Sequence, residues 1–331
     1  MRKKIITAVL FTISIILAGC HSGSNESQNK SEDQENKLNI VTTFYPMYEF
    51  TKEIVGDKTN ISMLIPTTVE PHDFEPTAKD LANIQQADGL VYNNENMETW
   101  IDEVQQAVNT EELELINASE GIELLPFLTE GHSHEEGHSH EEGHSHEEEQ
   151  SHGEGRSHEF DPHLWLSPKM AMLEVENISK KIIRIDPANR KTYEQNTKHY
   201  LEKLKKLDEQ YESVLKSVKN KEIITQHAAF GYLADSYGLK QIPIAGLSPD
   251  NEPSAKQLKE LKEFAKKHNI KTIFFEENAS SKVAETLANE LQAKTAVLST
   301  LEGLSDEEKQ NGETYISIME KNLQVLEKAL K

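Results

Sequence analysis

The sequence predicts an α/β protein with two parallel-sheet lobes bridged by one long helix. Short β-branched strands alternate with helical segments in both halves of the chain, a pattern typical of parallel sheets covered by helices. A run without glycine or proline extends over residues 188–219, and as a helix it would span roughly 45 Å. The 331 residues are also long enough for two domains with separate cores.

The first residues have the features of an export signal. Basic residues at positions 2–4 precede an apolar run that ends at Ala18 and is shorter than a membrane span of about 20 residues. Leu17-Ala18-Gly19 directly before Cys20 resembles the bacterial lipoprotein cleavage box. This resemblance implies a signal peptide over residues 1–19 and a lipid anchor on Cys20; the alternative is an ordinary signal peptide or an uncleaved anchor with an incidental cysteine. Residues 20–37, polar after the cysteine, are expected to be a disordered tether.

Residues 38–185 are expected to form the N-terminal α/β lobe. Strand character begins at Leu38 and is expected to stop at Pro46, and apolar residues at helical spacing follow to Val55. Ser167 is expected to cap a helix that has Pro168 at its first position and ends near residue 185. The other elements expected in this lobe are strands at 61–65, 89–92 and 113–116, and helices at 77–87 and 97–108.

Residues 186–219 are expected to form the linking helix, with a face of tyrosines, leucines and one valine between Tyr193 and Leu215. The alternative is a surface helix of a single large domain. Residues 220–331 are expected to form the C-terminal α/β lobe. Its expected strands lie at 222–225, 271–275 and 294–298, and its expected helices at 229–237, 254–268, 280–291 and 314–330.

Residues 131–158 form a His-rich loop that repeats the motif H-S-H-E-E-G. The segment has almost no apolar side chains to offset the entropy of ordering it, so we expect a solvated loop and no core element. Its eight histidines, interleaved with glutamates, are expected to bind several zinc ions weakly. A solubilising spacer is the alternative. Such a loop could collect, buffer or sense zinc.

Charge argues against one class of partner, and the cysteine count excludes two kinds of structural feature. A net charge of −22 argues against binding to nucleic acid, which requires basic patches. The single cysteine, Cys20, excludes an intramolecular disulfide and a zinc site made of cysteines.

Three histidines lie in loops between predicted strands and helices: His72, His163 and His227. Ligands of open α/β sheets bind beyond the carboxyl ends of the strands, where these loops lie. None of the three is spaced like a local zinc motif such as H-E-x-x-H, so only the fold can bring them together. Three glutamates also lie just beyond predicted strands and are candidate carboxylate ligands: Glu276, Glu277 and Glu302.

The order of motifs along the chain resembles one known family. The lipoprotein box is followed by E-P-H-D-F-E-P-T, the His-rich loop, D-P-H-L-W-L-S-P, the long helix and T-Q-H-A-A-F-G-Y-L. This order is similar to that of the zinc-binding lipoproteins of bacterial ABC importers, substrate-binding proteins once called adhesins, and the resemblance covers the whole mature chain. It implies a metal site in the cleft between the lobes, with His72 and His163 from the first lobe and His227 from the second. The implied fourth ligand is Glu302, with Glu276 as the second choice.

The resemblance also implies a function. The chain is expected to capture Zn²⁺ as a monomer, held by its lipid anchor on the extracellular face of a Gram-positive cell membrane. It is expected to deliver the ion to a zinc ABC permease that works with an ATPase subunit. Three imidazoles and one carboxylate suit zinc, whereas manganese prefers more oxygen ligands. Manganese-binding relatives resemble the pattern but carry aspartate as the fourth ligand and lack the His-rich loop.

Two further alternatives are a surface adhesin and a secreted zinc hydrolase. A hydrolase keeps one zinc position open for water and needs a general base, a role that Glu302 or Glu276 could take. Outside the His-rich repeat the sequence contains neither H-E-x-x-H nor G-x-S-x-G, so an enzyme is not expected.

Overall fold

The computed structural model describes residues 37–67, 69–109, 112–127, 160–247, 254–276 and 282–331. The expected signal peptide, Cys20, the tether up to residue 36 and the His-rich loop lie outside the described residues. From Leu38 onward the chain forms one compact unit. Within the described ranges, no helix combines the length and the apolar character that crossing a bilayer requires.

The first half of the unit contains a four-stranded parallel sheet in the order β2-β1-β3-β4. Its strands are β1 (Asn39–Thr42), β2 (Asn60–Met63), β3 (Gly89–Tyr92) and β4 (Glu114–Asn117). Successive side chains of a strand point to opposite faces, so Ile40 and Val41 of β1 belong to different apolar clusters on the two sides of this sheet. Both faces are therefore buried, as expected for a parallel sheet.

The second half repeats this topology with the order β6-β5-β7-β8, again with all strands parallel. Its strands are β5 (Glu222–Thr225), β6 (Lys240–Pro243), β7 (Thr272–Phe275) and β8 (Lys294–Val297). Ile223 and Ile224 of β5 again belong to different clusters. The predicted fold class, two parallel sheets with helices, is confirmed.

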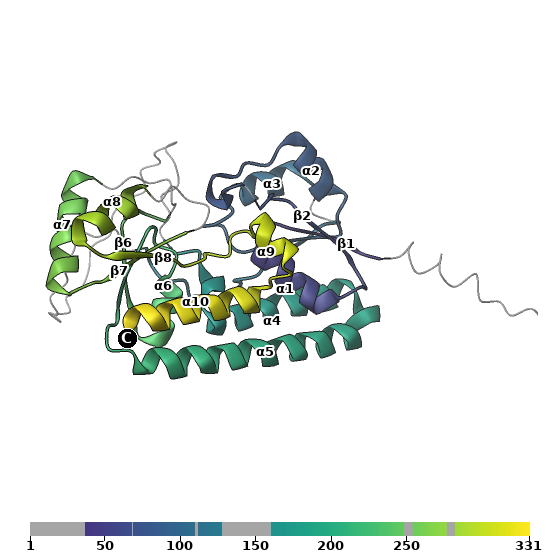
Figure 1. Cartoon of the computed structure of the whole chain (residues 1–331). Helices are drawn as coiled ribbons and strands as arrows, with labels where there is room; N and C mark the ends of the chain where they lie inside the picture. The colour runs from purple at the N-terminus through teal and green to yellow at the C-terminus, as the bar shows by residue number, and fades with distance from the viewer. Residues whose placement is uncertain (1–36, 68, 110–111, 128–159, 248–253, 277–281) are drawn as a thin grey trace, which may run out of the picture. The chain divides into compact units, whose positions relative to one another are not determined.

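Helices cover both faces of each sheet (Figure 1). They are α1 (Tyr45–Val55), α2 (Ala78–Gln85), α3 (Ile101–Ala107), α4 (Pro168–Ile185), α5 (Arg190–Ser217), α6 (Gly231–Tyr237), α7 (Ala255–Lys267), α8 (Lys282–Leu291), α9 (Asp306–Gln310) and α10 (Tyr315–Leu330). Local signals explain several of their ends. Thr77 and Asp80 form a capping box at the start of α2, and Pro168 occupies the first turn of α4.

Several predicted boundaries were wrong. The first strand ends at Thr42, and Pro46 belongs to the first turn of α1, where its missing N–H leaves no hydrogen bond unmade. The helix expected from Met97 begins at Ile101, because the Glu98 carboxylate accepts backbone N–H groups of Asn93 and Asn94 and holds a turn there.

Other differences concern the linking helix and the second half. A 3₁₀ turn, Pro187–Asn189, precedes α5, so the long helix begins at Arg190. Strand β6 and helix α9 were not predicted from the sequence. Ser167 does start α4, but its side chain makes no cap hydrogen bond and instead pairs with the Ser236 hydroxyl at 2.8 Å.

Helix α5 packs against elements from both halves of the chain. Near its start, the hydroxyls of Tyr193 and Thr59 lie 3.0 Å apart, and near its end Tyr211 donates to the Met319 carbonyl at 2.7 Å. The buried face recurs at a spacing of three and four residues, which is the period of one helical face: Tyr193, Thr197, Tyr200, Leu204, Leu207, Tyr211 and Leu215. Val214, the valine expected on this face, is only partly buried. The long helix thus ties the two sheets into one core.

Helix α10 also joins the two halves. It lies beside α5 in Figure 1 and belongs by sequence to the second half. Its first residue, Tyr315, packs edge-on against Phe50 of α1 with ring centroids 5.0 Å apart. The Tyr315 hydroxyl also donates to the Trp165 carbonyl at 2.5 Å. Helices α5 and α10 therefore both connect the second half of the chain to the first.

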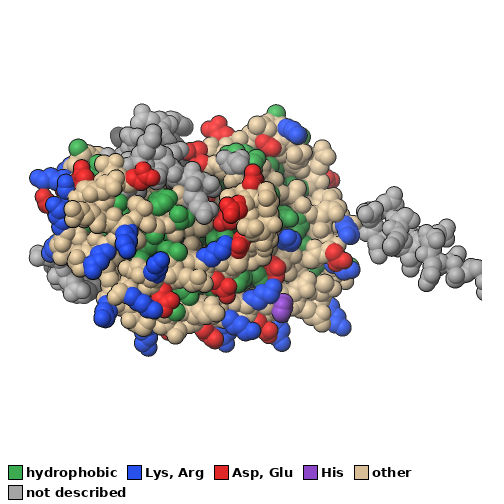
Figure 2. All heavy atoms as spheres, viewed as in Figure 1, with side chains coloured by type: hydrophobic (Ala, Val, Ile, Leu, Met, Phe, Trp, Pro, Cys, Tyr) green, Lys and Arg blue, Asp and Glu red, His purple; other side chains and the backbone are tan. Residues whose placement is uncertain are grey.

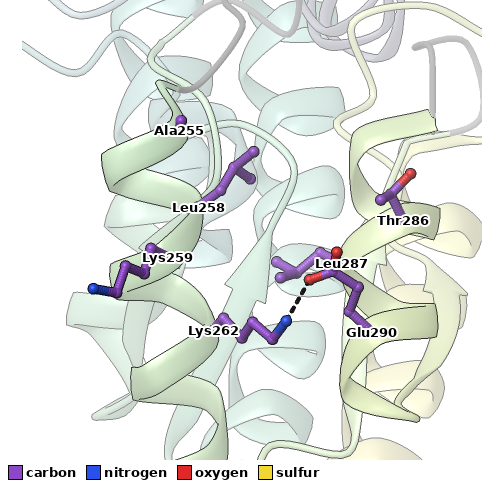
Figure 3. Close-up of a pocket in the computed structure, with 7 residues that line it drawn as sticks. All are labelled: Ala255, Leu258, Lys259, Lys262, Thr286, Leu287 and Glu290. Carbon is purple, nitrogen blue, oxygen red and sulfur yellow. Dashed lines mark hydrogen bonds and ion pairs between the residues drawn. The ribbon is translucent and has the colours of Figure 1, made fainter.

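The outer surface carries intermingled acidic and basic side chains on the face shown in Figure 2. Between α7 and α8 there is a groove of about 450 Å³, where the apolar side chains of Leu258 and Leu287 lie (Figure 3). Lys262 forms an ion pair with Glu290 across this groove at 2.8 Å. None of the residues that line the groove is one of the predicted metal ligands.

Candidate metal centre

The predicted ligands occupy loops at the carboxyl ends of strands or just before a helix. His227 follows β5, Glu302 follows β8, and His72 lies in a 3₁₀ turn, Pro71–Asp73, between β2 and α2. His163 lies directly before the 3₁₀ turn that leads into α4. In parallel sheets, ligands bind beyond the carboxyl ends of the strands, between two neighbouring strands from which the chain order runs in opposite directions. In the second sheet the reversal lies between β5 and β7, the strands that precede His227 and Glu276.

Four side-chain atoms converge at this edge. The Nε2 atom of His163 lies 3.1 Å from Nε2 of His72 and 3.4 Å from Nε2 of His227. Oε1 of Glu302 lies 3.7–3.8 Å from all three Nε2 atoms. A tetrahedral zinc ion with bonds of about 2.0–2.1 Å requires ligand atoms about 3.3–3.4 Å apart. The observed separations suit such an ion after small side-chain adjustments.

The cluster is buried. His163 has no exposed surface, and the exposed fractions of His227, His72 and Glu302 are 1%, 8% and 9%. Among the described residues, Oε1 of Glu302 has no hydrogen-bond partner. A buried carboxylate oxygen without a partner is costly, and a bound cation would satisfy it.

The backbone around Glu302 is held in an unusual conformation. Leu301 has φ of +58°, a left-handed value that costs a residue other than glycine about 1–2 kcal/mol. The next residue, Gly303, approaches the first half so closely that a Cβ there would lie 2.7 Å from the Thr67 carbonyl oxygen. The Glu302 loop is thus pressed against the segment that leads to His72.

Two further carboxylates contact Nδ1 of His163 and of His227, the ring nitrogens that do not face the cluster. Oδ1 of Asp161 lies 2.7 Å from Nδ1 of His163 and accepts the His163 backbone N–H at 2.9 Å. Oε1 of Glu276 lies 2.5 Å from Nδ1 of His227. A carboxylate beside Nδ1 favours the tautomer that carries its proton on that nitrogen. The Nε2 lone pairs of His163 and His227 then point into the cluster.

These contacts determine what the cluster can hold. Electron pairs on Nε2 of His163, on Nε2 of His227 and on the Glu302 carboxylate face one another at distances below 4 Å. Such atoms repel unless a cation or protons lie between them. The arrangement therefore suits a divalent metal, with protons as its competitors.

Burial and the neighbouring charges shift the pKa values of these groups. Burial alone would lower the pKa of His227, but the charge and hydrogen bond of Glu276 outweigh it, and the pKa of His227 rises to about 9. Burial raises the pKa of Glu302, and the nearby Glu276 charge adds to this effect. Burial likewise raises the pKa of Asp161 to about 7. Protons are thus held firmly in the metal-free cluster.

The structure brings together all four residues that the sequence analysis ranked first: His72, His163, His227 and Glu302. Glu276 lies next to His227 but on the side away from the ligand atoms. Sequence reasoning missed Asp161. Its position two residues before His163, in the segment D-P-H, is the one local signal that could have indicated it.

Comparisons with known proteins agree with this geometry. The family model described as zinc-uptake complex component A, periplasmic, matches residues 40–329. The high-affinity zinc uptake system protein ZnuA of Bacillus subtilis is 52% identical over 97% of both chains. The zinc-binding lipoprotein AdcA of Streptococcus pneumoniae is 47% identical over 98% of this chain, which spans 60% of AdcA.

A solved structure shows the same fold. The Zn(II)-bound ZnuA-like domain of Streptococcus pneumoniae AdcA is 45% identical to this chain and superposes with a TM-score of 0.73. The match covers 89% of this chain and 99% of that domain.

Proposed function

Because the chain belongs to the zinc-uptake complex component A family, we propose that it captures Zn²⁺ outside the cytoplasm and delivers it to a membrane permease. The ligands in this proposal are His72, His163, His227 and Glu302. The observation that carries it is the convergence of three Nε2 atoms and one buried carboxylate oxygen, contributed by both halves of the chain. Four protein ligands close a zinc site, whereas a catalytic zinc keeps a position for water, so capture is favoured over hydrolysis.

The location and partners are part of the same proposal. A lipid anchor on Cys20 would hold the protein, as a monomer, at the outer face of a Gram-positive cell membrane, and the lipoprotein name of the AdcA relative supports this. The partners would be an ABC permease and its ATPase subunit, which fits the description of the family as a component of an uptake complex.

Calorimetric titration with zinc tests the proposal. The mature chain should bind one ion tightly, and the weaker sites expected in the His-rich loop should titrate separately after it. A strain that lacks the protein should grow normally in zinc-rich medium and poorly when zinc is scarce. Absence of a tight site in the chain, or normal growth without the protein at limiting zinc, would contradict the proposal.

The two candidate carboxylates can be distinguished by substitution. Glu302→Ala removes a proposed ligand, so zinc affinity should fall more than a hundredfold. Glu276→Ala removes only the partner of Nδ1 on His227, and loss of such an outer contact typically costs 10–100-fold. Competition with a chelator of known affinity measures both changes. The reverse ranking would assign Glu276 as the ligand.

Zinc binding should release protons and strengthen with rising pH. The pKa of His227 is about 9 without metal and that of Glu302 is raised, so at pH 7 the ion must displace protons that these groups hold. Apparent affinity should therefore rise from pH 6 to pH 9 and fall towards pH 5. Calorimetry in two buffers with different heats of ionisation counts the released protons. Identical heats in both buffers, with affinity independent of pH, would argue against histidine ligation.

A further inference from the structure

We propose that Asp161 and Glu276 are positioning residues that hold His163 and His227 as Nδ1–H tautomers, and that these two carboxylates set the preference of the site for zinc over manganese. The inference rests on the proposed function, since it concerns the same ligands. It assigns a role in metal selection to two residues that are not ligands: Asp161, from the segment before α4, and Glu276, which directly follows β7.

The Asp161 side chain is held next to His163 by its burial and by contacts of both carboxylate oxygens. Its side chain is buried, and Oδ1 accepts both the backbone N–H and the Nδ1–H of His163. Its other oxygen fits against Gly231, where a Cβ would lie only 2.3 Å from Oδ2. The next residue, Tyr232, donates its hydroxyl to the Asp161 carbonyl at 2.9 Å. The segment that supplies His227 thus also positions Asp161.

Glu276 has an equally fixed place. It directly follows β7, which pairs with β5, the strand that leads to His227. The His227 backbone is held by the Thr225 hydroxyl at 2.8 Å and the Gln241 amide at 3.0 Å, both donating to its carbonyl. With backbone and Nδ1 both held, the imidazole has little freedom to rotate. These contacts direct Nε2 of His227 towards Nε2 of His163 and the Glu302 carboxylate.

This arrangement affects which metal is preferred. A carboxylate on Nδ1–H increases the electron density that Nε2 donates to a metal. Zinc gains more from strong imidazole donors than manganese, which prefers oxygen ligands. Two such pairs in one site should therefore increase the ratio of zinc affinity to manganese affinity.

The test uses Asp161→Asn and Glu276→Gln, which keep an acceptor oxygen but remove the charge. Zinc, manganese and cobalt are the probes, with affinities measured by chelator competition and ligand geometry followed by the cobalt absorption spectrum. Glu222→Gln is the matched control, because Glu222 makes the same kind of contact with Nδ1 of His268, at 2.6 Å, away from the site. Nitrogen NMR of the zinc-loaded protein reports the tautomer of each imidazole.

Each site variant should lower zinc affinity about tenfold or more, lower manganese affinity less, and change the cobalt spectrum. Glu222→Gln should leave all three as in the unmodified protein. Unchanged zinc affinity and zinc-to-manganese ratio in both site variants would overturn the inference. An equal loss for both metals would also overturn it, because that result indicates a merely structural role. If the unmodified protein itself lacks a tight zinc site, the proposed function fails instead.

Discussion

Replacing His163 with alanine is expected to abolish tight binding of one zinc ion per chain. His163 lies at the centre of the cluster, 3.1 and 3.4 Å from the Nε2 atoms of the other two histidines and 3.7 Å from the Glu302 carboxylate. Its loss leaves three ligands in a geometry preset for four. Affinity should fall by more than the 10–100-fold that is typical for loss of an outer partner.

Zinc titration of the purified variant measures this effect, and His199→Ala provides the control. His199 lies on the exposed face of α5, so its removal should leave the affinity unchanged. His72→Ala and His227→Ala should behave like His163→Ala. Because His163 is fully buried, the melting temperature of each metal-free variant should be recorded as well. A folded His163→Ala protein with normal affinity would remove this residue from the site.

Replacing Trp165 with alanine is expected to lower the free energy of unfolding by about 3–5 kcal/mol, the usual cost of truncating a large buried aromatic residue. Trp165 has no exposed surface and packs edge-on against Phe44 with ring centroids 4.9 Å apart. Its indole N–H donates to the Thr300 carbonyl at 2.7 Å, so the substitution also leaves a buried acceptor without its partner.

Urea unfolding of the metal-free protein, followed by circular dichroism, measures the change. Leu173→Ala on α4 is the control, since Leu173 is 41% exposed and exposed positions usually change stability by less than about 0.5 kcal/mol. Zinc affinity should also fall in Trp165→Ala, because Thr300 lies two residues before Glu302. An unfolding midpoint equal to that of the unmodified chain would show that the indole contributes nothing to holding the two halves together.

The sequence by itself determined the features that depend on near neighbours along the chain. The capping box of Thr77 and Asp80, the start of α4 at Pro168 and the buried face of α5 all arise from contacts within three or four residues. Together with the short β-branched runs, such helix signals yielded the alternation of strands and helices, and hence two parallel sheets. The resemblance to a known family then ranked the ligands, a step that spacing alone did not permit.

Only the tertiary structure decided which polar groups meet. His72 and His163 are 91 residues apart in the chain, and His163 and His227 are 64 apart, yet their Nε2 atoms lie within 3.4 Å. The Ser167 hydroxyl, predicted as a cap, pairs with Ser236, 69 residues away. Glu276, considered as a ligand, contacts the far side of His227, and Asp161 was not recognised at all. Local patterns specify helices and strands because their energies are local, whereas the partner of a buried polar atom depends on which loops the fold brings to the same sheet edge.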